Sequence, residues 1–242
     1  MAGPDAQQCV LDFVSALQVG SLELPSAECA KAVVAKFLGY GIVAGSAGLK
    51  LPQILRVYGK RSAEGLSRDM FLVETGVYAV ILAYSLQLAM PFSAYGECVL
   101  ILAQNVALLA LMAYFSSVSA SRLALEAVAG AALAAVLLTG ALAGEPLRRL
   151  FEANALIMSC ARLAQVRKNI VQGSTGELSA TSVAAALLGG LVRVLTTLQA
   201  GIGGPVLRAY VLGCSTNATL LAQIVWYARK GADKGAGKKK TT

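Results

Sequence analysis

Apolar residues gather along the chain in blocks of about twenty, which short charged or Gly- and Pro-containing stretches separate. Because an α-helix rises about 1.5 Å per residue, a block of this length crosses roughly 30 Å of hydrocarbon. The pattern therefore predicts seven transmembrane helices. Their expected ranges are 31–55, 69–89, 95–115, 121–143, 149–168, 178–199 and 205–228.

The segment before the first predicted span does not have the pattern of a cleavable signal peptide. Met1 to Gln8 lack basic residues, and the following stretch to Leu24 is interrupted by Asp12, Gly20 and Glu23. We expect an amphipathic segment at the membrane interface, with the first span acting as an uncleaved insertion signal.

Composition agrees with a membrane protein of the all-α class. The 242 residues are 57% hydrophobic and 14% charged, and the mean hydropathy is +0.66, which is more apolar than one soluble core of this length needs. There is no histidine, and no Cys-x-x-Cys spacing occurs, so we expect neither a metal site nor a cofactor. The cysteines are expected to be small apolar side chains, and the sequence predicts no disulfide. They are Cys9, Cys29, Cys98, Cys160 and Cys214.

Basic residues gather on one side of the predicted membrane. The first, third and fifth loops and the C-terminal tail carry most of the lysines and arginines, whereas the N-terminal segment is acidic. By the positive-inside rule, we expect the N-terminus outside the cell or in a lumen and the C-terminus in the cytosol. The net charge of +8 is thus a topology signal rather than a sign of nucleic-acid binding, and the basic tail can attract anionic lipids. The loop residues are Arg56, Lys60, Arg61, Arg68, Arg122, Arg167 and Lys168.

The sequence matches itself at one constant offset of 112 residues, which relates Gln53 to Gln165. Chance similarity between apolar helices does not explain identical polar pairs, and these indicate an internal repeat. We predict two parallel three-helix repeats joined by a linker helix that restores the direction of the second copy. The expected parts are a lumenal segment 1–30, a first repeat 31–115, a linker region 116–148, a second repeat 149–228 and a cytosolic tail 229–242. The other polar pairs are Gln87 with Gln199 and Asn105 with Asn217.

Pro52 and Gln53 lie where the first predicted helix ends. Proline inside a spanning helix frees a backbone carbonyl, which a neighbouring polar group must satisfy, and Gln53 is well placed for this. The second copy keeps Gln165 but has Ala164 in place of the proline. We therefore expect a mobile first half, which Pro52→Ala would straighten, and a stiffer second half. A static kink is the alternative.

Ionisable and amide side chains inside the spans are the candidate ligand-binding groups, since burying them is costly. Arg193 lies deepest and can bind a phosphate, pair with Glu74, or bond carbonyls freed in the other copy. Lys50, Glu74 and Arg162 lie nearer the cytosolic ends, where long side chains can reach the interface. The full candidate set is Arg193, Arg162, Lys50, Glu74, Gln87, Gln199, Asn105 and Asn217.

A Pro-Gln dipeptide at a helix end, followed by a polar loop ending in Leu-Ser, resembles the PQ-loop family. Within it, the chain is similar to the mannose-P-dolichol utilization defect 1 family over most of residues 39–228. The stretches that carry this similarity are Lys50-Leu51-Pro52-Gln53, Ser62-Ala63-Glu64-Gly65-Leu66-Ser67, Pro91-Phe92-Ser93 and Gly176-Glu177-Leu178-Ser179.

The resemblance implies an endoplasmic-reticulum factor that the lumenal use of dolichol-phosphate mannose and dolichol-phosphate glucose requires. Such donors feed N-glycan and GPI-anchor assembly. Translocating the lipid-linked sugar, presenting it to glycosyltransferases and chaperoning those enzymes all fit the resemblance. Lys239 and Lys240, fourth and third from the C-terminus, have the spacing that coat proteins recognise for retrieval to this compartment.

An enzyme is not expected. Without histidine no Ser-His-Asp set exists, and neither an Asp-x-Asp motif nor a Gly-rich phosphate loop is present. The alternative functions are a transporter of a small soluble sugar or amino acid and a scaffold for glycosyltransferases, because a fold does not by itself fix a function.

Overall fold

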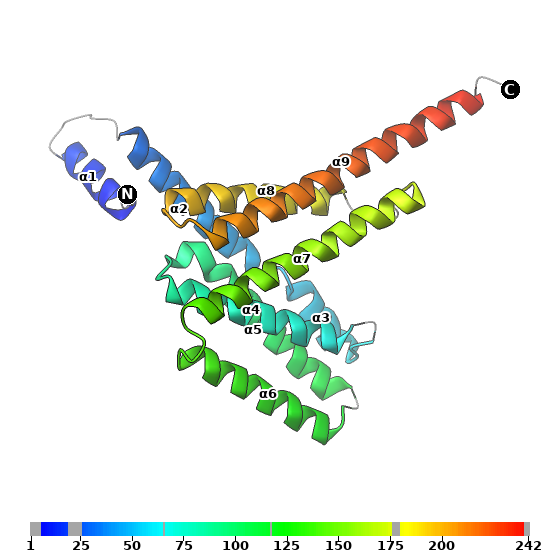
Figure 1. Cartoon of the computed structure of the whole chain (residues 1–242), viewed down its shortest axis with the longest axis horizontal. Helices are drawn as coiled ribbons and strands as arrows, with labels where there is room; N and C mark the ends of the chain where they lie inside the picture. Colours follow the sequence, from blue (N-terminus) through cyan, green and yellow to red (C-terminus); the bar gives the residue numbers. More distant parts are fainter. Residues whose placement is uncertain (1–5, 19–25, 65, 117, 176–179, 240–242) are drawn as a thin grey trace. The chain divides into compact units, whose positions relative to one another are not determined.

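The computed structural model describes residues 6–18, 26–64, 66–116, 118–175 and 180–239 (Figure 1). These residues form helices and loops without a strand, which confirms the all-α prediction for the described part of the chain. The helices are α1 Ala6–Gln18, α2 Ala27–Ser46, α3 Leu51–Lys60, α4 Arg68–Gln87, α5 Phe92–Phe115, α6 Ala120–Leu138, α7 Glu145–Gln172, α8 Ala180–Gln199 and α9 Pro205–Lys239.

Five segments of the described chain are long and apolar enough to cross a membrane: Ala27–Lys60, Arg68–Gln87, Phe92–Phe115, Ala120–Leu138 and Ala180–Gln199. They coincide with five of the seven predicted spans. The other two predicted spans, 149–168 and 205–228, lie in α7 and α9, which are long enough but too polar to join this set. The five apolar helices make the chain a multi-pass membrane protein.

The described chain divides into two compact units, one ending at Phe151 and the other beginning at Glu152. In the N-terminal unit, α2, α3 and α4 each pack against α5. α5 can serve this central role because it is almost continuously apolar over 24 residues. The core that results contains Val57, Phe71, Leu108 and Met112, each less than 4% exposed.

A glycine allows α2 to approach α5 closely. A Cβ atom at Gly39 would lie 2.8 Å from the carbonyl oxygen of Ser93, closer than such atoms approach in proteins. Small residues at helix contacts are the usual means of close packing in membranes, where the hydrophobic effect does not drive helices together.

Serine side chains begin three of the helices. Ser26, Ser67 and Ser119 are the N-caps of α2, α4 and α6, and each accepts a hydrogen bond from a backbone N–H in the first turn. Leu66, just before the cap of α4, packs against the core of the N-terminal unit. The Leu-Ser pair noted in the sequence therefore fixes the start of α4. Its expected second copy, Leu178-Ser179, lies outside the described residues.

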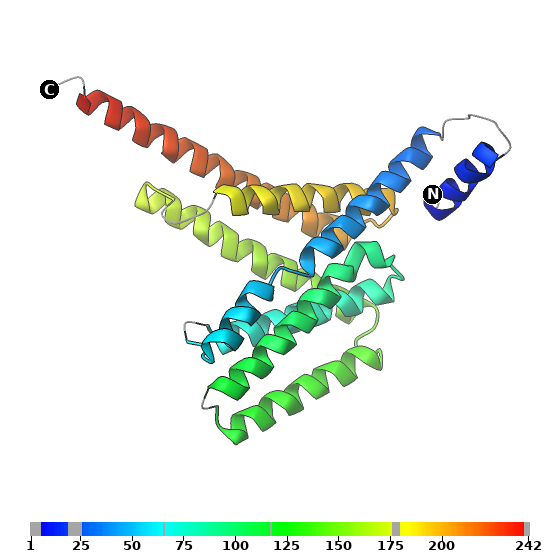
Figure 2. The ribbon, with the colours of Figure 1, turned by 180° about the vertical axis from the view of Figure 1, so that it is seen from behind.

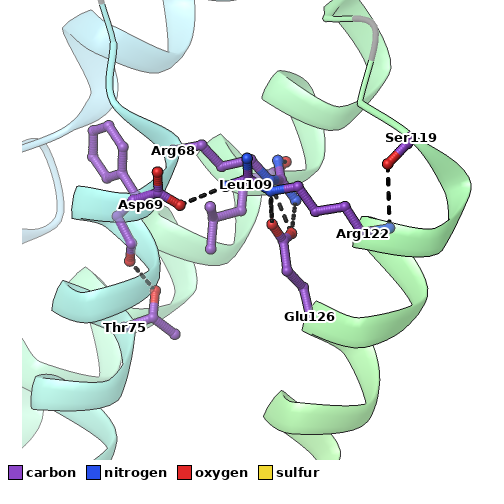
Figure 3. Close-up of polar contacts among 8 residues, drawn as sticks. Arg68, Asp69, Thr75, Leu109, Ser119, Arg122 and Glu126 are labelled. Carbon is purple, nitrogen blue, oxygen red and sulfur yellow. Dashed lines mark hydrogen bonds and ion pairs between the residues drawn. The ribbon is translucent and has the colours of Figure 1, made fainter.

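α6 is attached to α4 by charged side chains at its first turns (Figure 3). Arg68 donates from Nη2 to Glu126 at 2.5 Å and from Nη1 to the carbonyl oxygen of Leu109 at 2.7 Å. Arg122 bonds Glu126 at 3.0 Å and also pairs with Asp69. In contrast, no residue of α6 is buried.

In the C-terminal unit, α8 and α9 lie side by side (Figures 1 and 2). Gly190 permits this contact, since a Cβ atom there would lie 2.8 Å from the sulfur of Cys214. α7 is joined to α9 by polar side chains, including an ion pair between Arg208 and Glu152 at 2.6 Å.

Cys9 of α1 and Cys29 of α2 form a disulfide, a pairing that could not be argued from the sequence and that corrects the expectation of small apolar side chains for these two cysteines. The segment predicted to be interfacial does contain a helix, α1, but it is tied covalently to the start of the first span. The two cysteines are 20 positions apart in the sequence, and no spacing motif predicts the bond between them.

Candidate functional site

The first transmembrane segment is broken in its middle. α2 ends at Ser46 and α3 begins at Leu51, so four residues, 47–50, interrupt the helix. Pro52 lies in the first turn of α3, where its missing N–H would have no helical partner in any case. The proline is therefore compatible with the start of α3. Its proposed hinge role stays a prediction.

Gln104 of α5 satisfies the backbone groups that the break exposes. Its Oε1 accepts a hydrogen bond from the backbone N–H of Lys50 at 2.8 Å, and its Nε2 donates to the carbonyl oxygen of Ser46 at 2.9 Å. The sequence analysis assigned this task to Gln53, which is wrong, because Gln53 is exposed and α5 supplies the amide. One side chain thus bridges both sides of the break, as irregular backbone at membrane depth requires.

Lys50, at the break, forms a partly buried ion pair with Glu74 of α4. The Lys50 Nζ lies 2.5 Å from a carboxylate oxygen of Glu74, and the side chains are 9% and 29% exposed. The same ammonium lies 4.8 Å from the centre of the Phe71 ring, a favourable position for a cation. The expectation that Lys50 extends to the interface is wrong, because an internal carboxylate compensates its charge.

Asn105, the residue after Gln104, is fully buried at 0% exposure. Neither its Nδ2 nor its Oδ1 makes a hydrogen bond with the described residues. Buried amides nearly always have partners, and leaving one unsatisfied costs roughly 1–3 kcal/mol. Asn105 therefore has both of its amide atoms available for a bound water or ligand, and its role as a ligand-binding residue stays a prediction.

The C-terminal unit contains a chain of amide groups instead of a break. Gln165 donates to Asn169 at 2.8 Å, and Asn169 donates to Gln223 of α9 at 2.8 Å. Gln223 in turn donates to the carbonyl oxygen of Val166 at 3.0 Å. Gln165, expected to be a hinge residue, lies inside the continuous helix α7 and bonds the amide that connects this helix to α9.

The other predicted site residues are distributed over both units. Arg193 is 4% exposed in α8, as its depth in the span predicts, but the structure gives Glu74 a different partner, Lys50. Asn217 is 6% exposed in α9. Arg162 and Gln199 are half-buried, and Gln87 is exposed at the end of α4. Lys239 ends α9, and Lys240 lies outside the described residues.

The arrangement in the N-terminal unit brings Lys50, Glu74 and Gln104 together around the break. Of these, the sequence analysis named the ion pair's members separately and missed Gln104. The sequence feature that could have identified Gln104 is its position in an otherwise apolar span, beside the repeated Asn105. The three groups can hold an interrupted helix in a fixed geometry beside a buried amide.

A family model described as PQ loop repeat matches residues 34–93. The matched region runs from α2 through α3 and α4 to the start of α5, so it contains the break, Lys50 and Glu74. Gln104 and Asn105 lie beyond it. No solved structure matches the chain. The PQ loop repeat at residues 34–93 is thus the part of the resemblance that a family model supports.

Proposed function

We propose that this chain is a multi-pass protein of the endoplasmic reticulum membrane that makes dolichol-phosphate mannose and dolichol-phosphate glucose usable as lumenal donors. It binds or translocates the lipid-linked sugar and catalyses no reaction. The PQ loop repeat supports a transporter-like role. The sequence similarity described above supplies the finer assignment.

The observation that carries the proposal is the unsatisfied amide of Asn105. A sugar hydroxyl both donates and accepts hydrogen bonds, so one sugar can satisfy both the Nδ2 and the Oδ1 of an asparagine. The amide lies in a helix that crosses the membrane, one residue from the side chain that bridges the helix break. A change in the break would therefore reach the ligand-binding amide directly.

Arg193 is assigned to the phosphate of the lipid-linked sugar. A guanidinium offers two parallel donors to one phosphate, and this contact is strong where water is scarce. Arg162 and Asn217 are two further polar candidates for ligand binding within the C-terminal unit. Arg193→Lys keeps the charge but loses the fork, so a stable variant with normal retention of dolichol-phosphate mannose would contradict the phosphate assignment.

Reconstitution separates the proposal from its alternatives. The purified chain in liposomes is expected to bind or move dolichol-phosphate mannose but not free hexose, whereas a transporter of small solutes gives the opposite result. A scaffold co-purifies with glycosyltransferases and shows neither activity. Complementation of N-glycan and GPI-anchor synthesis in null cells provides the cellular readout.

Asn105→Leu is the decisive variant. If the amide serves a ligand, the nearly isosteric leucine leaves the thermal stability in detergent equal or higher and abolishes lipid-sugar handling. If the amide is structural, stability falls. Gln53→Leu, at an exposed position of the same repeat, is the matched control and is expected to behave as the unmodified protein.

The retrieval signal has its own test. Lys239→Ser together with Lys240→Ser is expected to move the protein out of the endoplasmic reticulum, because coat proteins act from the cytosol and the charge pattern places this tail there. Unchanged location in imaging would contradict the signal.

A further inference from the structure

A polar pocket lies within the N-terminal unit, between α3 and the loop that leads to α4. Its volume is about 720 Å³, within the range of roughly 300–1,000 Å³ typical of small-molecule sites. Val57, which is 2% exposed, and Leu66 give it an apolar floor that is continuous with the core of the unit. Charged and hydroxyl side chains form much of the remaining lining. They are Arg56, Lys60, Ser62 and Glu64.

Local hydrogen bonds hold the loop wall of the pocket in place. The Ser62 Oγ accepts a hydrogen bond from the backbone N–H of Glu64 at 3.2 Å, and the backbone N–H of Leu66 donates to the carbonyl oxygen of Ala63 at 3.1 Å. Ala63 is 6% exposed, and Leu66 packs against the core. Because a hydroxyl both accepts and donates, Ser62 keeps its proton for a ligand. The loop wall therefore has a fixed shape before a ligand binds.

The pocket contains two cations that have no counter-ion within the described chain. Arg56 and Lys60 are four residues apart, so they lie on one face of α3, where like charges repel each other. Neither forms an ion pair with a described acidic residue, and Glu64 of the same lining forms none either. By contrast, Lys50 and Arg68 each lie 2.5 Å from a carboxylate oxygen. A bound anion would supply the missing partner of the two cations.

The pocket opens away from the face of α3 that contacts lipid. Leu51, Leu55 and Tyr58 are 47%, 59% and 66% exposed, and their spacing places them on one side of the helix. They belong to a segment that is apolar enough to span a membrane, so this side faces hydrocarbon. Arg56 and Lys60 lie on the roughly opposite side, since each residue of an α-helix advances by about 100°. A ligand therefore reaches them from water, on the side that the charge pattern predicts to be cytosolic.

The lining favours a phosphate that is attached to a polyol. An arginine fork and a lysine ammonium are common partners of a phosphate group. The carboxylate of Glu64 repels a bare anion, but it accepts hydrogen bonds from hydroxyl groups. The volume exceeds what a single phosphate fills, and the apolar floor at Val57 can cover the C–H groups of a sugar ring.

We propose that the pocket between α3 and the loop that follows it binds a phosphorylated polyol, such as a hexose phosphate. The phosphate lies at Arg56 and Lys60. The hydroxyl groups of the ligand bond Ser62 and Glu64. The ligand comes from the aqueous phase, although the headgroup of a phosphoinositide has the same chemistry. The proposal does not depend on the function proposed above.

Titration calorimetry of the full chain tests the proposal. The protein is reconstituted in phosphatidylcholine nanodiscs and titrated with glucose 6-phosphate, and we expect saturable binding. Arg56→Gln and Lys60→Gln should each weaken this binding about tenfold, because each loses a charge-assisted hydrogen bond to the phosphate. Arg56→Lys keeps the charge but not the fork and should weaken it several-fold. Arg61→Gln is the matched control, since it removes one charge from the same segment but does not line the pocket, and it should leave the affinity unchanged.

Competition identifies the ligand and its source. Free glucose should not bind, and inorganic phosphate should bind more weakly than glucose 6-phosphate, a difference that Glu64→Ala should reduce. Phosphatidylinositol 4-phosphate added to the nanodiscs should leave the binding of glucose 6-phosphate unchanged, whereas competition would support the site but assign it to a lipid headgroup.

Three results would overturn the proposal. They are absence of saturable binding by both the sugar phosphate and the phosphoinositide, equal weakening by Arg61→Gln and Lys60→Gln, and equal affinity for inorganic phosphate and glucose 6-phosphate. The assay with dolichol-phosphate mannose uses a different ligand and a different readout, so a failure there is distinguishable from a failure here.

Discussion

The first transmembrane segment and the segment that matches it 112 residues later use polar side chains in different ways. The former breaks between Ser46 and Leu51, and an amide from α5 satisfies the exposed backbone. The latter, α7, runs without interruption from Glu145 to Gln172 and uses its own amides to bond α9. In the first segment, a polar side chain of another helix bonds the exposed backbone. In the second, polar side chains bond two helices to each other.

The corresponding positions show how this difference arises. The residue that matches Gln104 is Thr216, whose hydroxyl bonds carbonyls of its own helix at 3.2 and 3.0 Å. The residue that matches Asn169 is Val57, a member of the apolar core. Each copy therefore has a cross-helix amide at a position where the other copy has none. The two matched regions therefore differ in which helix supplies the amide.

The largest expected effect is loss of the ion pair that only the broken copy contains. Lys50→Met leaves Glu74, which is 29% exposed, without its partner and should lower the free energy of unfolding by roughly 3 kcal/mol, the lower end of the roughly 3–5 kcal/mol that breaking a fully buried pair costs. Lys50→Met with Glu74→Leu should recover most of the loss. The matched control is Arg162→Met, whose copy has Ala186 in the position of Glu74. Denaturation in detergent micelles measures all three, and an equally unstable double variant would contradict the pairing.

Placing a proline in the continuous helix α7 should have an effect of about the same size. Ala164→Pro removes one hydrogen bond in α7 and clashes with the preceding turn, which costs roughly 3 kcal/mol. Ala164→Gly should cost only about 1 kcal/mol. The same denaturation assay applies. A proline variant as stable as the glycine variant would show that α7 tolerates a break.

Gln104→Leu sharpens the comparison at the bridging side chain. The change leaves the N–H of Lys50 without its partner and removes one bond to the carbonyl of Ser46, so stability should fall by roughly 2 kcal/mol. Thr216→Val, at the matching position of the second copy, should have a much smaller effect, since its bonds stay within one helix. Hydrogen exchange of residues 47–51 should accelerate in Gln104→Leu alone. Unchanged exchange would remove Gln104 from its assigned role.

The smallest expected effect belongs to Pro52→Ala. The sequence analysis expects this change to straighten the helix, but α3 already begins at Leu51 and Gln104 stabilises the break. We now expect a stability change below about 1 kcal/mol and an intact break for the single variant. Combining Pro52→Ala with Gln104→Leu should allow α2 and α3 to join. Distances between spin labels at exposed positions of the two helices measure the outcome.

Features that depend on residues close together in the sequence could be predicted. Blocks of apolar residues predicted the five spans that the structure supports, and the proline marked the region where the first of them is interrupted. The burial of Arg193 followed from its depth in a span. Contacts between distant residues could not be predicted in this way, because Lys50 and Glu74 are 24 residues apart and Gln104 lies 54 residues from Lys50. Packing decides which of several polar residues in a span meet.

The repeated asparagines and the contact between α4 and α6 differ in how well the sequence predicted them. Asn105 and Asn217 were singled out by repetition alone, and both are buried. The contact between Arg68 and Glu126 was not expected, since Arg68 was assigned to a loop, Glu126 lay inside the predicted span 121–143, and the two residues are 58 positions apart. Its discovery required the positions of α4 and α6.

The disulfide between Cys9 and Cys29 gives information about the compartment that contains the N-terminus. Disulfides persist in the lumen of the endoplasmic reticulum and are rare in the cytosol. The charge pattern predicts that this end is lumenal, and a disulfide there agrees with that prediction. A maleimide applied to unreduced cells should modify the exposed, reduced Cys160 once the membrane is opened, but not Cys9 or Cys29. Two residues thus report orientation without any added tag.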